Sequence, residues 1–405
     1  MTIGSPTVRR VLAGELCSGC GLCAGIAPDA ITMTTVAPGY SRPQQHGAVS
    51  GRAEQAIARA CPGSVVAPWQ AAPGRHPYWG PYHRVLTGHA TDPGVRHAGS
   101  SGGAITALAI HALRTGLVQR VIHVVADPDL PTRNITVVST TPEAVLAGAG
   151  SRYAASSPLA DIDELLAGEG RIAFIGKPCD VSALRQLATV DARVDAQVPV
   201  MLAFFCAGLP SHAGADRIVR DMGLEPDEVV AFRYRGNGWP GLTRAETRDG
   251  RVGEMRYADS WGGQLSREVQ FRCKICPDAV GGVADVAAAD AWYGGETGYP
   301  QFEEGDGRSL VITRTPAGES LLDAAVAAGA MAVSPLAIEE IDLMQPSQAR
   351  RKRAVAARTA ACAATLQPRP EMEGLDVLAA ARRGSAKEAA INLAGTARRI
   401  LQGRR

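Results

Sequence analysis

The sequence predicts an α/β (α+β) protein in three parts: a small module over residues 1–70, a larger α/β domain over 84–345 and a helical extension over 346–405. Three observations support this division. Four of the nine cysteines lie in the first part. Apolar runs typical of buried strands alternate with segments of helical periodicity in the second part. The third part is rich in Lys and Arg and breaks into helical pieces.

Composition narrows the class of protein. The chain has 405 residues with 46% hydrophobic and 20% charged residues, as in soluble globular proteins. A net charge of +2 and few aromatic residues argue against nucleic-acid binding. No apolar run approaches the roughly 20 residues of a transmembrane helix, and the N-terminus lacks the apolar core of a secretory signal. We therefore expect a cytoplasmic protein, in which cysteines serve as metal ligands or catalytic thiols instead of forming disulfides.

The first module contains the densest cysteine run. Cys17, Cys20 and Cys23 follow the C-x2-C-x2-C spacing of bacterial ferredoxins, whose fourth cysteine precedes a proline. Here Ala27 occupies that fourth position, and the distant Cys61, also followed by proline, can supply the missing ligand. Zinc usually takes separate C-x2-C pairs. The spacing therefore predicts a degenerate ferredoxin-like module with one four-iron (4Fe-4S) cluster.

A segment rich in Pro and Gly, residues 67–84, is the expected linker to the α/β domain. In that domain, Ser100 and Ser101 are candidate caps for a helix that ends at Gly116. The predicted strands are 84–91, 118–126, 134–140, 170–176 and 198–208, and the predicted helices are 102–116, 142–149 and 180–188. Strands that alternate with helices in this way predict a layered α/β sheet.

The remaining cysteines suggest a second site. Cys179 follows the strand predicted at 170–176, Cys206 ends the one at 198–208, and Cys273 and Cys276 form a C-x2-C pair. Since α/β sheets place ligand sites at strand ends, these segments can converge on one four-thiolate site. The spacing alone leaves 4Fe-4S and zinc open, and Cys179 or Cys206 could also be a simple buried thiol.

The C-terminal extension carries thirteen Lys or Arg and four Asp or Glu. We expect a solvated helical extension packed on the body or on a partner chain, because charge runs usually mark solvated faces. The alternative is a basic surface for an acidic electron-carrier protein or an anionic substrate.

Eight motifs occur in an order that is typical of one family. They are GSSGGAITAL (99–108), GSRYAASSPL (150–159), GKPCDVSALR (176–185), FFCAGLPS (204–211), FRYRGNGWPG (232–241), CKICPD (273–278), ADVAAADAWYG (284–294) and GRSLVITRT (307–315). Together they resemble the coenzyme F420 hydrogenase/dehydrogenase beta subunit family. Its relatives include 7-hydroxymethyl chlorophyll a reductase and the ferredoxin-type divinyl chlorophyllide reductases. The resemblance covers residues 10 to 340.

The resemblance implies FAD, held by a non-Rossmann α/β domain beside one or two 4Fe-4S clusters. The residues that match flavin-binding positions are Ser100, Ser101, Gly102, Gly103, Thr106, Ser156, Asp290 and Trp292. Arg152 and Tyr153 match a family segment near the flavin. Lys177 matches a position before the cluster cysteine where the family often has a small polar residue, and the three are the candidate catalytic residues. Lys177 could stabilise a reduced flavin, or it could pair with Asp180 at the surface. The resemblance also assigns Cys179, Cys206, Cys273 and Cys276 to a second 4Fe-4S cluster instead of zinc.

These assignments predict an iron–sulfur flavoprotein oxidoreductase. Ferredoxin or another redox protein exchanges single electrons with the clusters, and FAD exchanges a hydride with coenzyme F420 or an unsaturated organic substrate such as a tetrapyrrole. The direction of flow cannot be read from the ligands. One alternative is an electron-transfer subunit of a larger redox complex, without substrate chemistry of its own. Another is a flavin-free, zinc-stabilised binding protein. A homo-oligomer remains open.

Overall fold

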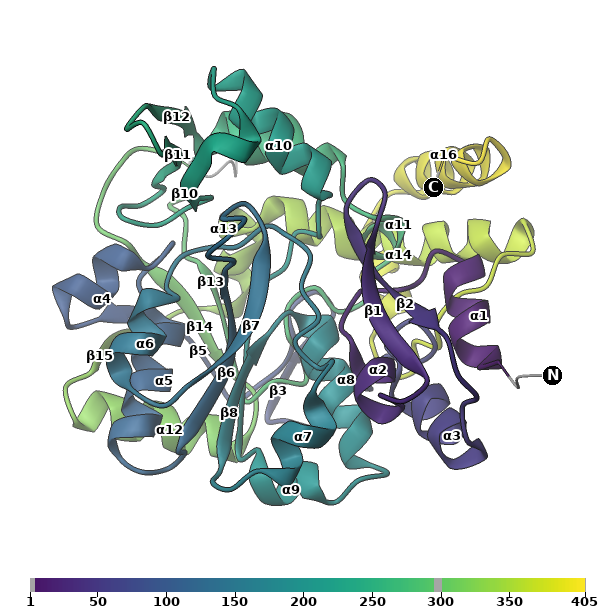
Figure 1. Cartoon of the computed structure of the whole chain (residues 1–405), viewed down its shortest axis with the longest axis horizontal. Helices are drawn as coiled ribbons and strands as arrows, with labels where there is room; N and C mark the ends of the chain where they lie inside the picture. Colours follow the sequence, from purple (N-terminus) through teal and green to yellow (C-terminus); the bar gives the residue numbers. More distant parts are fainter. Residues whose placement is uncertain (1–3, 295–300, 405) are drawn as a thin grey trace.

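A large mixed β-sheet forms the centre of the molecule (Figure 1). The computed structural model describes residues 4–294 and 301–404, and within them this sheet has eight strands in the order β15-β5-β14-β13-β9-β8-β6-β7. The strands are β5 (Arg84–Ala90), β6 (Arg120–Ala126), β7 (Asn134–Ser139), β8 (Ile172–Gly176), β9 (Val200–Phe204), β13 (Val286–Asp290), β14 (Ser309–Thr313) and β15 (Met331–Pro335). All five strands predicted for the α/β domain are therefore present.

Strand direction defines a functional edge. β6, β8, β9 and β13 are parallel, and β5 runs in the same direction because it is antiparallel to β14, which is antiparallel to β13. The carboxyl ends of these five strands therefore lie along one edge of the sheet, where open α/β sheets bind ligands. Cys179, Cys206 and Asp290 all lie at this edge.

Helices cover both faces of the sheet (Figure 1). One face packs against α5 (Ala104–Arg114), α6 (Pro142–Ala147) and α12 (Pro316–Ala327), and the other against α7 (Ile162–Ala167), α8 (Pro178–Ala188) and α9 (Arg193–Gln197). Successive residues of β9 alternate between these two cores, with Met201 on the α8 side and Leu202 on the α5 side. Burial on both faces explains why the central strands are continuous apolar runs.

The predicted caps of the helix at 102–116 are wrong. The helix begins after Gly103, whose φ is +74°, and ends at Arg114. Ser100 Oγ accepts a hydrogen bond from Ser151 Oγ at 2.8 Å, and Ser101 Oγ donates to the carbonyl of Arg308 at 2.8 Å. Both hydroxyls thus hold neighbouring segments instead of the first turn of α5.

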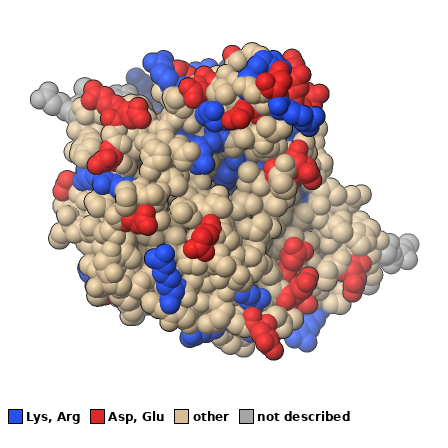
Figure 2. Space-filling view, turned by 60° about the vertical axis from the view of Figure 1, so that its left-hand side comes forward, with Lys and Arg blue, Asp and Glu red and all other residues tan. Residues whose placement is uncertain are grey.

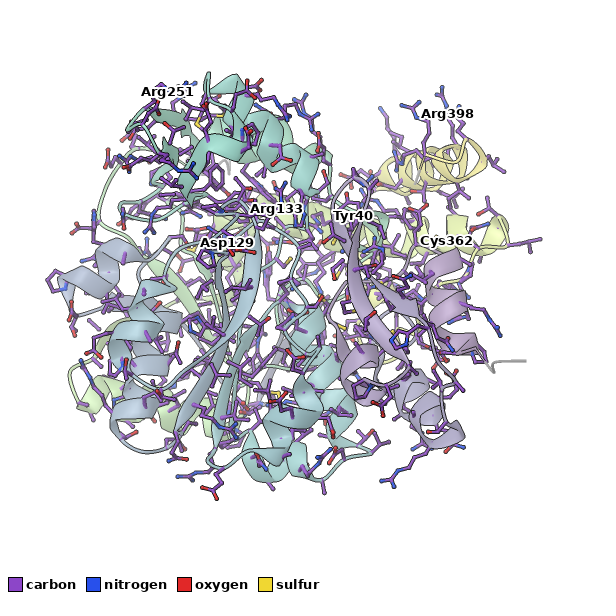
Figure 3. The ribbon with its side chains drawn as sticks, in the orientation of Figure 1. Tyr40, Asp129, Arg133, Arg251, Cys362 and Arg398 are labelled. Atoms are coloured by element: carbon purple, nitrogen blue, oxygen red, sulfur yellow. The ribbon has the colours of Figure 1, made fainter. Side chains whose placement is uncertain are left out.

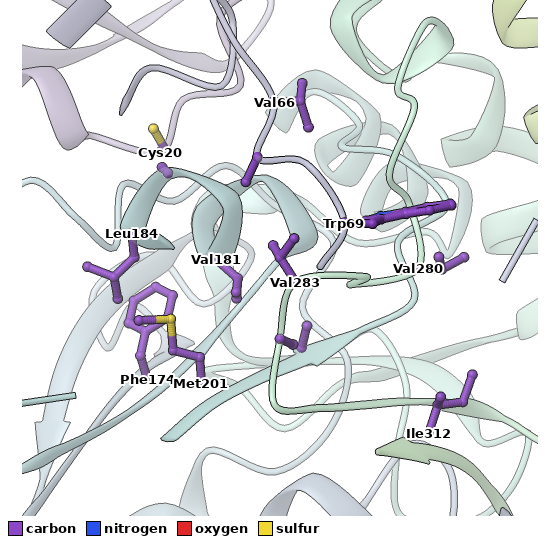
Figure 4. Close-up of a cluster of buried hydrophobic side chains, with 14 of the residues drawn as sticks. Cys20, Val66, Trp69, Phe174, Val181, Leu184, Met201, Val280, Val283 and Ile312 are labelled. Carbon is purple, nitrogen blue, oxygen red and sulfur yellow. The ribbon is translucent and has the colours of Figure 1, made fainter. Parts of the chain in front are cut away.

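The cysteine-rich module comprises α1 (Pro6–Ala13), α2 (Leu22–Ile26), the hairpin of β1 (Ile31–Val36) and β2 (Tyr40–Gln45), and α3 (Gly51–Ala60). It packs on α8 at the right of Figure 1. Cys20 and Val66 join the same buried cluster as Phe174 and Leu184 of the main domain (Figure 4). The module and the main domain therefore share a core.

The prediction that residues 67–84 form a linker is wrong, because this segment also packs into the shared core. Residues 67–84 contain the short hairpin of β3 (Gly74–His76) and β4 (Gly80–Tyr82). Trp69, Tyr78 and Trp79 from this segment are buried in the main core. The Pro and Gly residues therefore shape turns within the core and do not form a flexible connection.

A smaller lobe is inserted between β9 and β13; most of it lies at the top of Figure 1, and its last helix lies lower, near the C-terminal helices. It comprises α10 (His212–Asp221), η1 (Pro226–Glu228), β10 (Val229–Arg233), β11 (Leu242–Thr247), β12 (Val252–Arg256), η2 (Ala258–Gln264), η3 (Leu265–Arg267) and α11 (Phe271–Lys274). Phe232 and Tyr234 pack with Ile218 and Val219 in its own core. The C-x2-C pair begins within α11, so this lobe delivers two cysteines to the sheet edge.

The C-terminal extension is helical, as predicted. It follows η4 (Ile338–Glu340) and α13 (Ile341–Met344) and comprises α14 (Pro346–Ala364), α15 (Val377–Arg382) and α16 (Ala386–Leu401). The predicted breaks at 367–368 and 384–385 fall between these helices. However, one side of α14 is not solvated but packs on the body, because Gln348, Lys352 and Val355 are buried. None of the helices in the described ranges is long and apolar enough to cross a membrane.

Candidate functional site

The first four predicted ligands lie together. Cys17, Cys20, Cys23 and Cys61 line one small apolar cavity with Ile57 and other side chains. The first three come from the loop and first turn of α2, and Cys61 is the C-cap residue of α3. The distant cysteine thus closes the set, as the loss of the fourth ligand at Ala27 predicts.

Burial makes these thiols hard to ionise in the apo chain. It raises the pKa of all four cysteines, that of Cys61 to about 11, and the proximity of the other thiols adds to this for Cys20, Cys23 and Cys61. Arg42 and Arg272 act in the opposite direction on Cys17. Four thiolates would need further positive charge here, which a coordinated metal supplies.

The second set also converges. Cys179 lies in the first turn of α8, Cys206 two residues beyond β9, Cys273 in α11 and Cys276 just after it. Burial raises the pKa of Cys206 to about 12, and Cys273 and Cys276 are close enough to contribute to this shift. Cys206 and Cys276 likewise raise the pKa of Cys179, after burial and Asp180. In neither set do three ligand side chains converge closely enough, within the described ranges, to hold one metal ion.

A buried arginine, Arg272, lies between the two cysteine sets. The Arg272 side chain is only 2% exposed and lies next to Cys273 in sequence. Its Nη2 donates to the carbonyl of Pro62 at 2.9 Å, beside Cys61. Its Nε and Nη1 are buried with no hydrogen-bond partner in the described part of the chain. Buried donors without acceptors are costly, so these N–H groups indicate an acceptor that the polypeptide does not supply. Sequence reasoning assigned no role to Arg272.

Lys177 is the predicted catalytic residue that lies closest to a cysteine set. Its Nζ lies 2.7 Å from Asp180 Oδ2 and donates to Ser156 Oγ at 3.2 Å. Burial by itself would lower the pKa of Lys177, but the carboxylate of Asp180 and the thiol of Cys179 outweigh it and raise this pKa. The expected surface ion pair is therefore wrong, since both partners are buried. The pair fixes an ammonium ion beside Cys179.

Arg152 and Tyr153 have structural contacts instead. Arg152 donates to Asn134 Oδ1 and to three carbonyls, at 2.6 to 3.0 Å, so four of its five N–H groups are occupied. Tyr153 packs on Trp261, with ring centroids 4.6 Å apart. These contacts anchor the 150–157 segment to the inserted lobe. Ser156, at the end of that segment, lines a cavity of about 730 Å³ between the β1–β2 hairpin and β7.

That cavity has polar walls. Arg133, which forms an ion pair with Asp216 at 2.8 Å, lies on its wall, and Figure 3 labels it near Tyr40 of β2. Ser157 Oγ donates to the carbonyl of Gly19 at 3.0 Å, so the segment beside the cavity also contacts the first cysteine run. The cavity thus adjoins both the first set and, through Ser156, Lys177.

The loop before α5 is packed tightly against β14. Gly102 N–H donates to Ser309 Oγ at 2.9 Å, and Ser101 occupies the serine position of a G-x-S-x-G pattern. Its hydroxyl, however, contacts Arg308, Ala289 and Ser309 instead of a histidine. Gly103 has no side chain to cap α5, so the N–H groups of its first turn, up to Thr106, remain available to an anion.

Gly102→Ala should destabilise the fold whether or not a ligand is bound. Its Cβ would lie 2.6 Å from the carbonyl oxygen of Gly88 and 2.7 Å from Ser309 N, both of which are backbone atoms. We expect a loss of about 1–3 kcal/mol in the free energy of unfolding, measured by urea denaturation. Gly51→Ala is the control, because its Cβ would meet nothing within 4 Å. Equal stability of the two variants would contradict the packing role.

Asp290 and Trp292 belong to a buried cation–aromatic cluster centred on Arg235. The guanidinium of Arg235 forms two hydrogen bonds to Asp290, at 2.7 and 2.9 Å. It lies 4.5 Å from the ring centroid of Tyr257 and 5.1 Å from that of Trp292. Trp239 Nε1 donates to Asp290 Oδ1 at 2.9 Å, and its ring stacks on Trp292. The motif at 232–241 contained this arginine, but nothing local in the sequence identified its partners.

A cavity of about 580 Å³ adjoins this cluster. It is lined by three arginines, two glutamates and aromatic side chains, among others: Arg233, Arg244, Arg256, Glu254, Glu304, Tyr257 and Phe302. Figure 2 shows a hollow below the inserted lobe in which Lys and Arg side chains gather. Asp290 and Trp292 therefore support the wall of a charged cavity instead of pointing freely into a site.

Comparison with known proteins identifies the family. Residues 85–162 match the family described as "Coenzyme F420 hydrogenase/dehydrogenase, beta subunit N-term", and residues 169–339 match its C-terminal counterpart. The coenzyme F420 hydrogenase subunit beta of Methanococcus voltae is 28% identical over 261 residues, which is 62% of this chain and 84% of the relative. The 7-hydroxymethyl chlorophyll a reductase of Oryza sativa subsp. japonica is 25% identical over 60% of this chain and 50% of its own length.

A solved structure supports the fold. A chain of the F420-reducing [NiFe] hydrogenase complex of Methanosarcina barkeri superimposes with a TM-score of 0.55 at 23% identity, covering 71% of this chain and 96% of that one. Helices α14, α15 and α16 lie beyond residue 339, where the match to the family ends. The chain belongs to the coenzyme F420 hydrogenase/dehydrogenase beta subunit family.

Proposed function

We propose that this chain is an iron–sulfur flavoprotein oxidoreductase in which two 4Fe-4S clusters relay single electrons and FAD exchanges a hydride with an organic molecule. The observation that carries this proposal is the convergence of eight cysteines into two neighbouring sets, one in the N-terminal module and one at the carboxyl edge of the sheet. The first cluster is assigned to Cys17, Cys20, Cys23 and Cys61, and the second to Cys179, Cys206, Cys273 and Cys276.

The residues present fit iron–sulfur clusters. The first set surrounds a cavity and has ferredoxin spacing, which favours a multi-atom cluster over a single zinc ion. The unpaired N–H groups of Arg272 fit cluster sulfur, since hydrogen bonds to sulfur are a common feature of such sites. In the second set, the N–H of Leu209 donates to Cys273 Sγ at 3.3 Å. Both sets therefore combine thiols with N–H donors. Beside the second set, the Leu209 N–H is directed at sulfur, and beside the first set, two N–H groups of Arg272 have no other acceptor in the described part of the chain.

We propose that FAD lies along the carboxyl edge of the sheet, from the start of α5 toward Lys177. Three strands separate β5 from β8, so the two ends are about 19 Å apart at about 4.8 Å per strand, as an extended dinucleotide requires. The first turn of α5 would hold the pyrophosphate, as helix N-termini do. FAD supplies the junction between single-electron and hydride chemistry.

The residues of this chain then have defined tasks. Asp180 and Ser156 hold the ammonium group of Lys177 in place, and it remains protonated at neutral pH because its pKa is raised. A fixed positive charge at this position would stabilise negative charge that develops on a reduced flavin. Arg152 and Tyr153 would position the adjoining segment without contacting the reacting atoms.

The hydride partner is proposed from the relatives. Their names refer to coenzyme F420 and to 7-hydroxymethyl chlorophyll a, so F420 and a tetrapyrrole-like unsaturated substrate are the two candidates. Ferredoxin or another redox protein would exchange the single electrons. A second function is favoured by one observation, namely that the solved structural neighbour belongs to a hydrogenase complex. This chain could instead relay electrons within such a complex.

Anaerobic purification followed by iron, sulfide and flavin analysis tests the scheme. We expect about eight irons and one flavin per chain. Stoichiometric zinc without iron would contradict both clusters, and about four irons would contradict the second one. Reduced F420 and reduced ferredoxin should each bleach the flavin in a stopped-flow experiment. If neither does, both donor assignments fail, and co-purification with a stable redox partner would then favour the relay function.

A further inference from the structure

Four polar side chains on α14 hold the loops that carry the second cysteine set. Gln348 Nε2 donates to the carbonyl of Cys206 at 3.0 Å, and Arg351 Nη2 donates to that of Cys273 at 2.9 Å. Arg358 Nη1 donates to the carbonyl of Lys274 at 2.7 Å. The remaining bonds run from Arg351 Nη1 to Ala207 O and from Lys352 Nζ to Pro277 O. Arg351 and Lys352 follow Gln348 by three and four residues, so each lies on the same side of the helix as Gln348.

Lys352 faces inward. It is only 3% exposed, and its Nζ lies 4.5 Å from the ring centroid of Trp69, whereas Arg351 and Arg358 are half-buried. Arg351 is close enough to Cys206 to act on that thiol electrostatically, and Asp278 and then Cys276 act in the same way on Lys352. The outward basic surface is on α16, where Arg398 points away from the body in Figure 3. The buried Lys352 of α14 is therefore unsuited to the expected role of docking a partner.

Carbonyl binding alone does not explain the charge. Gln348 shows that a neutral amide can hold a carbonyl at this surface. Lys352 nevertheless buries a cationic group, and Arg351 and Arg358 are half-buried. In the described ranges none of the three forms an ion pair with a carboxylate. Burial lowers the pKa of Lys352 to about 8 and that of Arg358 to about 10. A buried cation is costly without negative charge nearby; the buried Asp278 carboxylate supplies part of that charge for Lys352, and the Cys276 thiol adds to it.

We propose that α14 is an electrostatic cap for the second cluster, in which Arg351 and Lys352 stabilise its negative charge and so set its reduction potential. This inference rests on the proposed function, because a cluster bound by four thiolates supplies the negative charge. Cations beside the cluster favour the more negative, reduced state and therefore raise the potential, which responds to net charge and hydrogen bonding. The cap lies outside the residues that match the family, which end at 339.

Arg351→Gln and Lys352→Gln test the cap in the full-length chain prepared anaerobically. Each variant removes a charge and retains a hydrogen-bond donor, so charge is separated from carbonyl binding. Arg350→Gln is the matched control, since Arg350 is exposed on the same helix and donates to Ser347 Oγ. Arg351→Lys restores the charge. The readouts are iron content and a reductive titration in which both clusters are followed by electron paramagnetic resonance.

We expect one of the two clusters to shift to a more negative potential in both glutamine variants, while the other keeps its wild-type potential. Arg350→Gln should leave both unchanged, and Arg351→Lys should largely restore the shifted one. Loss of about half the iron from the glutamine variants alone would also support the cap. Wild-type potentials at full iron content would overturn the inference and leave the proposed function intact. A wild-type chain without the second cluster would overturn both.

Discussion

Cys61→Ser should abolish the first cluster and leave about half of the wild-type iron. Cys61 is the only ligand of this set outside the 17–23 run, and Ala27 cannot replace it. Its position as C-cap of α3 fixes it at the cavity that the other three thiols line. A serine hydroxyl is a poorer ligand for iron than a thiolate. Iron and sulfide analysis, together with the electron paramagnetic resonance spectrum of the reduced chain, would measure the loss.

Cys362→Ala is the control for that experiment. Cys362 is fully buried on α14 in the same apolar cluster as Leu16, Ile400 and Cys17, but it is not one of the proposed ligands. This variant should keep all of the iron even if it loses some stability. Cys276→Ser should remove the other half of the iron, which belongs to the second cluster. Unchanged iron in Cys61→Ser would refute the assignment of the first cluster, and equal losses from Cys61→Ser and Cys362→Ala would show that the loss reflects general destabilisation.

Features encoded over short distances in the sequence were predictable. The C-x2-C-x2-C run, the alanine at the fourth position and the distant Cys61 together identified a set that the structure brings to one cavity. The strands were identified by continuous apolar runs, because β8 and β9 are buried on both faces. The family resemblance added the choice of a 4Fe-4S cluster over zinc for the second set, which spacing left open.

The partners of charged residues were not predictable, because tertiary contacts decide them. Arg272 reaches Pro62 across 210 positions, and Lys352 reaches Pro277 across 75. From its composition the basic extension was expected to be solvated, but three cations of α14, Arg351, Lys352 and Arg358, donate to carbonyls that lie far away in the sequence. The expected linker failed for a related reason, since the aromatic residues between its turns are buried. Local turn residues do not reveal whether a segment packs into a core.

Arg235→Ala should reduce the free energy of unfolding by about 3–5 kcal/mol, because it leaves the Asp290 carboxylate without its cation in a largely buried site. The arginine side chain is 2% exposed and that of Asp290 is 17% exposed, so solvent screens the pair weakly. The substitution also removes the cation that contacts the rings of both Tyr257 and Trp292, which stack on each other with centroids 6.0 Å apart. Arg235→Lys should restore little, since a lysine cannot form both hydrogen bonds to the carboxylate.

Arg244→Ala provides the matched comparison for this last prediction. Arg244 lies in the same lobe and approaches two carboxylates, those of Glu246 and Glu254 at 3.2 and 3.5 Å, but its side chain is 45% exposed. Exposed pairs of this kind contribute about 0–1 kcal/mol, so this variant should be nearly as stable as the wild type. Denaturant unfolding followed by tryptophan fluorescence measures both. A similar stability of the two variants would mean that the Asp290 carboxylate does not depend on Arg235. That result would favour the original prediction, in which Asp290 and Trp292 contact the flavin directly.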